Sequence, residues 1–141
     1  MKKTLKIICG LMIVTVMLAG LSACGGVPEP DYAEPITEEL LQAMEAEDYA
    51  GYTGHFNEEM LQAVTEPVFM EVITTIKAAI GSYQSKEFWK TVDEGAYKSV
   101  YYRAKFSQET ENVIVRVVFQ EIDSEVSIAG IWFDSPMLRG Q

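Results

Sequence analysis

Cysteine is scarce in this chain of 141 residues, which contains two, Cys9 and Cys24. Cys9 lies in an apolar N-terminal stretch that we expect to be removed as a leader, which leaves Cys24 as the single cysteine of the mature protein. An internal disulfide is thereby excluded, although an oxidising compartment would permit one. We therefore expect an ordinary hydrophobic core to stabilise the fold.

Lysine and arginine are absent from residues 24–76, which contain 12 acidic residues. Removal of residues 1–23 takes away three lysines and no acid, so the net charge falls from −10 for the whole chain to −13 for the mature one. This charge excludes nucleic acid as a partner. It also predicts repulsion from anionic lipid headgroups within a screening distance of about 8 Å.

Residues that carry chemistry are few. His55 is the single histidine, which argues against a transition-metal site, and we find neither a calcium-binding loop nor a glycine-rich phosphate loop. The sequence therefore predicts no metal and no cofactor. Asp48 lies close to His55 in the sequence, and a carboxylate next to a histidine can act as a general acid or base. This pair is the one acid–base candidate.

The apolar stretch at residues 7–21 is shorter than the roughly 20 residues that a spanning helix needs. Three lysines precede it, and Leu-Ser-Ala-Cys at residues 21–24 ends it, as in a secretory signal peptide. The tetrapeptide resembles the lipobox of bacterial lipoproteins. The resemblance implies cleavage before Cys24, a diacylglyceryl group on its sulfur, and acylation of the new N-terminus, for example with palmitate. It places the domain outside the cytoplasm, anchored by lipid to the cell membrane or the outer membrane.

Composition divides the chain into a signal peptide at residues 1–23, a flexible Gly/Pro tether at 24–35, and one domain at 36–136. Glycine makes the first part of the tether loose, and its three prolines favour an extended backbone. At roughly 3.1 Å per residue, we expect the tether to hold the domain on the order of 30 Å from the bilayer.

Hydrophobic residues recur with helical spacing in the first half of the domain. The pattern predicts a helix over residues 36–49 with Thr37 as its N-cap. It predicts a second, short helix capped by Asn57, and a third that starts near Pro67 and stops at Gly81.

After residue 83 the period changes to two, and β-branched and aromatic residues dominate. The pattern predicts strands at 84–92, 96–107, 112–122 and 126–134. Short links between them imply an antiparallel meander, with the three helices on one of its faces. The fold class is α+β, with three N-terminal helices packed on a curved four-stranded antiparallel sheet.

Three strand segments carry a family resemblance: YYRAKF at 101–106, VIVRVVF at 113–119 and IAGIWF at 128–133, after EDYAGYTGHFNEEM at 47–60. They resemble a bacterial and archaeal family of unknown function, numbered 3887 among such domains. The family is similar to the nuclear-transport-factor-2-like (cystatin-like) superfamily, in which helices and a curved sheet form a cone. The resemblance covers roughly residues 36–134 and implies a fold but no activity. Some enzymes of that superfamily use an Asp–His pair inside the cone.

Apolar residues occupy both faces of the predicted sheet. Strict alternation places Ile128 and Trp132 on one face of the last strand, and the uncovered face is expected to expose Tyr101, Val118 and Trp132. Exposed apolar patches mark ligand or partner surfaces. We therefore expect a non-catalytic binding domain, with a homodimer through the sheet or a small apolar ligand as candidate partners. The alternative is a small lyase- or isomerase-like enzyme that uses Asp48 and His55.

Overall fold

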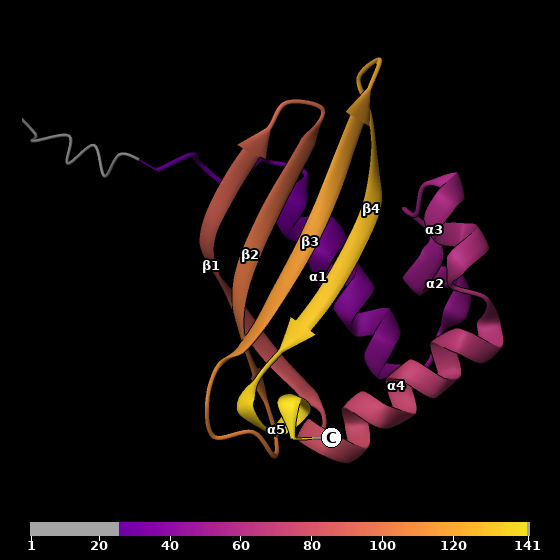
Figure 1. Ribbon diagram of the computed structural model, residues 1–141, viewed down its shortest axis with the longest axis vertical. Coiled ribbons are helices and arrows are strands. Elements are labelled where there is room, and N and C mark those ends of the chain that lie inside the picture. Colours follow the sequence, from indigo (N-terminus) through magenta and orange to yellow (C-terminus); the bar gives the residue numbers. More distant parts are fainter. Residues whose placement is uncertain (1–25, 141) are drawn as a thin grey trace, which may run out of the picture.

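The computed structural model describes residues 26–140, which form an α+β fold (Figure 1). Helices come first, the sheet follows, and one short helix ends the described chain. The helices are α1 (Ala33–Glu45), α2 (Tyr49–Thr53), α3 (Glu58–Ala63), α4 (Glu66–Ile80) and α5 (Pro136–Arg139), and the strands are β1 (Tyr83–Glu94), β2 (Tyr97–Phe106), β3 (Val113–Ile122) and β4 (Glu125–Asp134).

The four strands form one antiparallel sheet in the order β1-β2-β3-β4, which confirms the predicted meander. Two tight turns connect its outer strand pairs. Gly95 takes a positive φ of 79° in the β1–β2 turn, and Asp123 and Ser124 take φ values of 51° and 66° in the β3–β4 turn. Two consecutive residues with positive φ are typical of turns whose twist matches that of the flanking strands.

The helical half differs from the prediction at two points. Thr37 is not an N-cap, because α1 already begins at Ala33 and Thr37 lies buried inside it. Among residues 26–140, four helices precede the sheet instead of three, since α2 forms where the sequence predicted a break. The additional helix is capped by Asp48, whose Oδ1 accepts a hydrogen bond of 3.1 Å from the backbone N–H of Gly51.

The other two predicted helices are confirmed. The Oδ1 of Asn57 accepts a hydrogen bond of 2.9 Å from the backbone N–H of Met60 and so caps α3. The helix α4 carries Pro67 in its first turn and stops at Gly81, where φ is +80°. A residue with a side chain would be strained at that φ, which explains why glycine is suited to end this helix.

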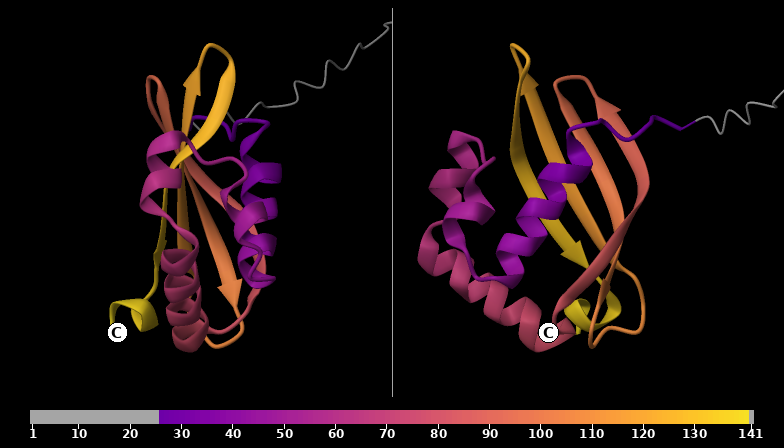
Figure 2. Two further views of the ribbon diagram at one scale, coloured as in Figure 1. Left: turned by 90° about the vertical axis from the view of Figure 1, so that its right-hand side faces the viewer. Right: turned by 180° about the vertical axis from the view of Figure 1, so that it is seen from behind.

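Of the four helices that precede the sheet in the described chain, α1 covers one of its faces, and α2 and α3 lie beyond its β4 edge (Figure 1). The helix α1 lies behind the strands in Figure 1 and in front of them in the reverse view of Figure 2, and α4 crosses near one end of the sheet. One hydrophobic cluster joins the two layers. It includes Leu40, Leu41 and Met44 of α1, Phe69, Ile73 and Ile80 of α4, and Val100, Tyr102, Val115, Val117 and Phe119 of the sheet.

The segment before α1 contacts the sheet. Val27 forms an isolated antiparallel bridge with Thr91 of β1, and the Tyr102 hydroxyl donates a hydrogen bond of 2.6 Å to Oε1 of Glu29. Burial and the Glu29 carboxylate raise the pKa of Tyr102, which keeps its hydroxyl available as a donor. Residues 27–35 belong to the predicted tether. In the structure, this segment contacts β1 and β2, and its last residues form the first turn of α1.

The edge strand β4 is partly paired by the loop between α2 and α3. The backbone N–H of Ile128 donates to the carbonyl of His55 (2.6 Å), and the N–H of Asn57 donates to the carbonyl of Ile128 (2.9 Å). A register shift opposite Val118 interrupts the alternation of β4 at this point, so Ile128 faces the core instead of sharing a face with Trp132. None of the helices in residues 26–140 is long and apolar enough to cross a bilayer.

Candidate functional site

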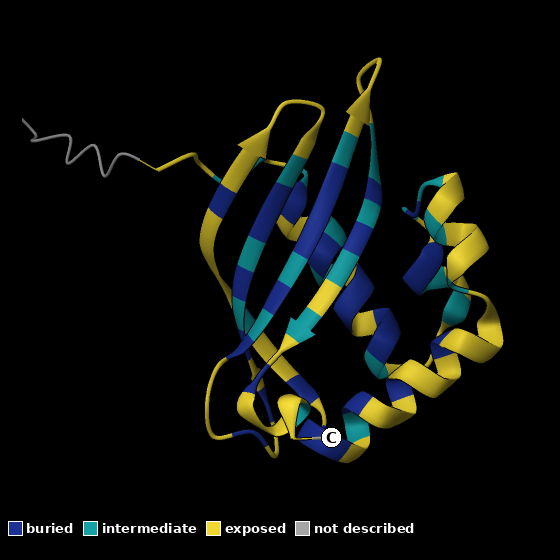
Figure 3. Ribbon diagram, viewed as in Figure 1, coloured by how far each residue is buried: buried dark blue, intermediate teal, exposed yellow. Residues whose placement is uncertain are grey.

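The face of the sheet turned away from the helices carries a row of aromatic and cationic side chains. Tyr101 of β2 pairs with Arg116 of β3, and Arg116 pairs with Trp132 of β4, so the three side chains lie side by side across the strands. Trp132 is 52% exposed. Figure 3 shows that β1, at one edge of this face, is exposed along most of its length.

Gly130 allows the Trp132 indole to lie against the sheet. A Cβ atom at Gly130 would clash with the six-membered part of that ring. The glycine therefore provides the space in which the indole lies over the strand, with one ring face presented to solvent and to neighbouring cations.

The cations of this face stack on its aromatic rings. The Lys90 Nζ lies 4.4 Å from the centre of the Trp89 ring and 4.7 Å from that of Tyr101, and the Arg103 guanidinium lies 4.8 Å from Trp89. The Arg116 guanidinium lies 4.7 Å from Trp132 and 5.7 Å from Tyr101. All of these distances are within the range of cation–π attraction. We call the set the outer-face platform: Trp89, Lys90, Tyr101, Arg103, Arg116 and Trp132.

Two of the three residues predicted for this surface, Tyr101 and Trp132, belong to the platform. Val118 lies on the same face but is only 8% exposed, so it supports the surface from below. Sequence reasoning missed Trp89. A β-bulge between Phe88 and Lys90 brings Trp89 and Lys90 next to Tyr101, and an alternation of period two does not reveal such a bulge.

Ion pairing separates the platform cations from the others in the described chain. Lys77, Lys86, Lys98 and Arg139 each lie within 4.0 Å of a carboxylate. None of the cations Lys90, Arg103, Lys105 and Arg116 makes such a pair among residues 26–140, and all four lie on the outer face. In an acidic protein, the unpaired positive charge is thus gathered on one surface.

On the opposite face, a buried lysine connects α1 to the sheet. The Lys86 side chain is 4% exposed, and its Nζ lies 2.7 Å from Oε1 of Glu34 and 3.0 Å from Oε2 of Glu38. Burial acts to raise the pKa of Glu38, but hydrogen bonds from Gln42, Tyr83 and Lys86 outweigh it and hold the pKa below its usual value. The two carboxylates thus balance the charge of Lys86, and Lys86 contributes to the packing of α1 on the sheet rather than to binding.

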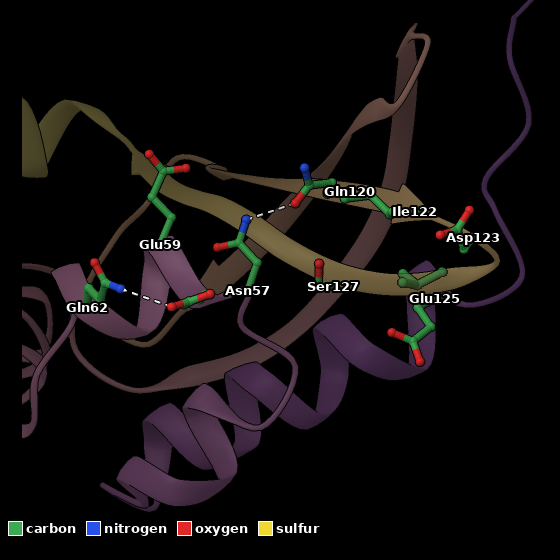
Figure 4. Close-up of a pocket in the computed structure, with 10 residues that line it drawn as sticks. Asn57, Glu59, Gln62, Gln120, Ile122, Asp123, Glu125 and Ser127 are labelled. Atoms are coloured by element: carbon green, nitrogen blue, oxygen red, sulfur yellow. Dashed lines mark hydrogen bonds between the residues drawn. The ribbon is translucent and has the colours of Figure 1, made fainter.

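A polar cleft of about 910 Å³ lies between α3 and the β3–β4 hairpin (Figure 4). The amide of Asn57 donates a hydrogen bond of 3.0 Å to Oε1 of Gln120 across it. Its lining also includes Glu58, Glu59, Asp123 and Glu125, and this polar character does not suit the small apolar ligand considered as a candidate partner. In residues 26–140, no group of three or more His, Cys, Asp or Glu is arranged to hold a metal ion.

In the structure, the side chains of Asp48 and His55 have different hydrogen-bond partners. The Asp48 carboxylate caps α2, whereas the Nε2 of His55 lies 3.1 Å from Oε2 of Glu39 on α1. Asp48 and His55 share no hydrogen bond in the described chain. Cys24, the predicted site of lipidation, lies outside the described residues.

A comparison with protein-family models finds one match, to the family described as protein of unknown function (DUF3887), over residues 37–131. This range covers more than half of the chain and includes all four strands except the end of β4. No curated protein matches the sequence.

Proposed function

Because the chain belongs to the protein family of unknown function DUF3887, its role has to be inferred from its own residues, and we propose that it is a lipid-anchored extracytoplasmic protein whose domain binds a partner without catalysis. The binding surface in this proposal is the outer-face platform.

The observation that carries the proposal is the uncovered row of aromatic rings and unpaired cations. Trp89 and Trp132 are 39% and 52% exposed, and stacked cations lie between and beside them. Tryptophan and arginine are the residue types most enriched at the energetic centres of interfaces. Their exposure on a small domain is explained if a partner covers them.

The anchor in this proposal is Cys24. A charged start, a short apolar stretch and Leu-Ser-Ala before the cysteine support cleavage and lipidation there. Each buried methylene contributes about 0.8 kcal/mol, so two or more acyl chains hold a protein stably where one gives only marginal binding. The domain division at residues 1–23, 24–35 and 36–136 follows from the same reasoning and stays a proposal.

We further propose that the domain is related to the nuclear-transport-factor-2-like superfamily. The support is architectural: helices that precede a curved, four-stranded antiparallel sheet and pack on one of its faces. The superfamily's cone-shaped interior also underlies the proposal of a small apolar ligand.

A small lyase- or isomerase-like enzyme is the second candidate. The contact between His55 and Glu39 favours it, since a carboxylate beside an imidazole can support proton transfer. The predicted partner Asp48 is occupied as a helix cap, so the carboxylate beside His55 is that of Glu39 instead.

Mass spectrometry of the protein purified from membranes tests the anchor. We expect an N-terminal peptide that begins at Cys24 and carries a diacylglyceryl group and a fatty acid, and a Cys24→Ser variant that keeps its leader. An intact leader on the native protein, or an unmodified Cys24 thiol, contradicts the proposal. Sedimentation of the detergent-solubilised protein tests the homodimer.

A further inference from the structure

The outer-face platform begins where the anchored end of the chain meets the sheet. Val27 pairs with Thr91 on β1, and the segment Gly26–Pro28 shares a small surface pocket with Trp89 and Lys90. Only three residue steps separate Cys24 from Val27. A fully extended chain spans at most about 3.6 Å per residue, so the lipid-bearing residue lies within roughly 11 Å of the sheet edge. The expected stand-off of about 30 Å is not available to this edge.

Charge distinguishes this face from the helical half. Its middle carries the cations Lys90, Arg103 and Arg116 and one carboxylate, Glu87, which lies opposite Arg103. A fourth cation, Lys105, lies near the end of β2 on the same face. Two further acids, Glu94 and Glu125, lie at the hairpin ends of the strands, and Asp134 is paired with Arg139. In contrast, residues 26–76, which include α1 to α3 and most of α4, contain no lysine or arginine. An anionic surface therefore attracts one side of the domain and repels the other within the screening distance of about 8 Å.

The chemistry of the platform is that of a membrane interface. Tryptophan and tyrosine rings favour the headgroup region of a bilayer, and lysine and arginine near it are attracted to anionic lipids. A second copy fits less well, because a face-to-face dimer with twofold symmetry brings the unpaired cations of both copies together.

We propose that the outer-face platform docks on the anionic headgroup surface of the membrane that holds the chain, so that the domain lies flat with its acidic helices directed away from the lipid. This inference rests on the lipid anchor at Cys24 of the proposed function. The lipid anchor raises the local concentration of the domain at the membrane, and the platform sets the orientation of the domain.

Tryptophan fluorescence tests the docking directly, because the chain contains two tryptophans and both belong to the platform. The lipidated protein is reconstituted in vesicles of phosphatidylcholine that contain phosphatidylcholine brominated close to the headgroup, with or without phosphatidylglycerol. We expect blue-shifted, bromine-quenched emission in the anionic vesicles and recovery of the emission at high salt. Emission that responds to neither phosphatidylglycerol nor bromine overturns the proposal, and equal quenching in both vesicles overturns its electrostatic basis.

A pair of charge reversals provides the matched control. Lys105 lies on the platform face opposite Ser85 and stacks on no ring, so Lys105→Glu changes the charge without touching the tryptophans. Lys77→Glu makes the same change on α4, where Lys77 pairs with Glu47 on the helical side of the domain. At about fivefold per elementary charge, Lys105→Glu is expected to lower the ratio of docked to free domain roughly 25-fold, and Lys77→Glu to leave it unchanged. Equal effects of the two variants overturn the assignment of the face.

The mass of the N-terminal peptide separates the two proposals. An unmodified Cys24 contradicts the anchor, whereas a lipidated protein with unquenched tryptophans contradicts the docking alone.

Discussion

The guanidinium of Arg116 lies 4.7 Å from the centre of the Trp132 ring on the neighbouring strand, on the face of the sheet that the helices leave uncovered. The same guanidinium donates hydrogen bonds of 3.3 Å and 3.0 Å, from Nε and Nη2, to the buried Oγ of Ser99. Arg116 thus holds the exposed indole and satisfies a polar group beneath the sheet surface.

Replacement of Arg116 is expected to cost more stability than replacement of Arg103. Arg116→Ala removes both the stacking on Trp132 and the hydrogen bonds to Ser99, which together are worth about 1–2 kcal/mol. Arg103→Ala removes stacking on Trp89 alone, worth about 0.5–1 kcal/mol at an exposed site. Urea unfolding of both variants measures the difference, and equal losses would contradict the role given to Ser99.

Gly130→Ala is expected to displace the Trp132 ring. The added methyl group overlaps the indole, which costs about 1–3 kcal/mol or moves the ring off the strand, with a shift of its fluorescence. Gly26→Ala is the control, because a Cβ atom there meets open space. A Gly130→Ala protein with unchanged emission and stability would show that the indole does not lie over this glycine.

Lys86→Met tests the connection between α1 and the sheet. It removes a buried cation from Glu34 and Glu38, and breaking a buried pair costs about 3–5 kcal/mol. Because both carboxylates are partly solvated, we expect a smaller loss, about 1–3 kcal/mol in free energy of unfolding. Lys105→Met, at an exposed position without a carboxylate partner, is expected to change stability by less than about 0.5 kcal/mol.

The pKa of Glu38 predicts acid sensitivity. Burial opposes ionisation, but the hydrogen bonds from Gln42, Tyr83 and Lys86 lower the pKa of the folded carboxyl below its ordinary value of 4.5. The unfolded chain therefore binds the proton first, so the contribution of Glu38 is present above pH 4.5 and is lost as the pH falls through the folded pKa. Unfolding free energies measured from pH 6 to pH 3 are expected to fall less steeply in Glu38→Gln. An equal slope in both proteins would rule out this contribution.

Asp48 is expected to act as a helix cap. Asp48→Ala removes the acceptor for the N–H of Gly51 and costs about 1 kcal/mol, whereas Asp48→Asn keeps an oxygen there and costs little. Thermal unfolding of the two variants checks the difference. An Asn variant as unstable as the Ala variant would mean that the charge, and not the cap, is what Asp48 contributes.

Much of the fold can be predicted from local patterns in this sequence. The strand boundaries lie within two residues of their predicted positions, because period-two alternation and turn residues specify them locally. The α2 helix could not be predicted in this way, since it is a single turn of five residues that depends on its cap and on contacts with α1.

The platform could be predicted only in part. Alternation along β2 and β3 correctly placed Tyr101 on the face turned away from the helices, but the bulges at Trp89 and near Ile128 change which side chains share a face. Cation–π pairs between strands also require the register, which the sequence does not reveal. The contact of Val27 with β1 could not be predicted either, because the sequence of a Gly/Pro-rich segment does not indicate strand pairing.

Oxidative footprinting of the protein in its native membrane, compared with the same protein purified in detergent, tests the platform as a binding surface most directly. Met70 on α4 is 37% exposed and serves as the reference on the helical side. We expect hydroxyl radicals to oxidise Trp89 and Trp132 several-fold less in the membrane than in detergent, with Met70 oxidised equally in both. Equal oxidation of the two tryptophans in both states would contradict the account.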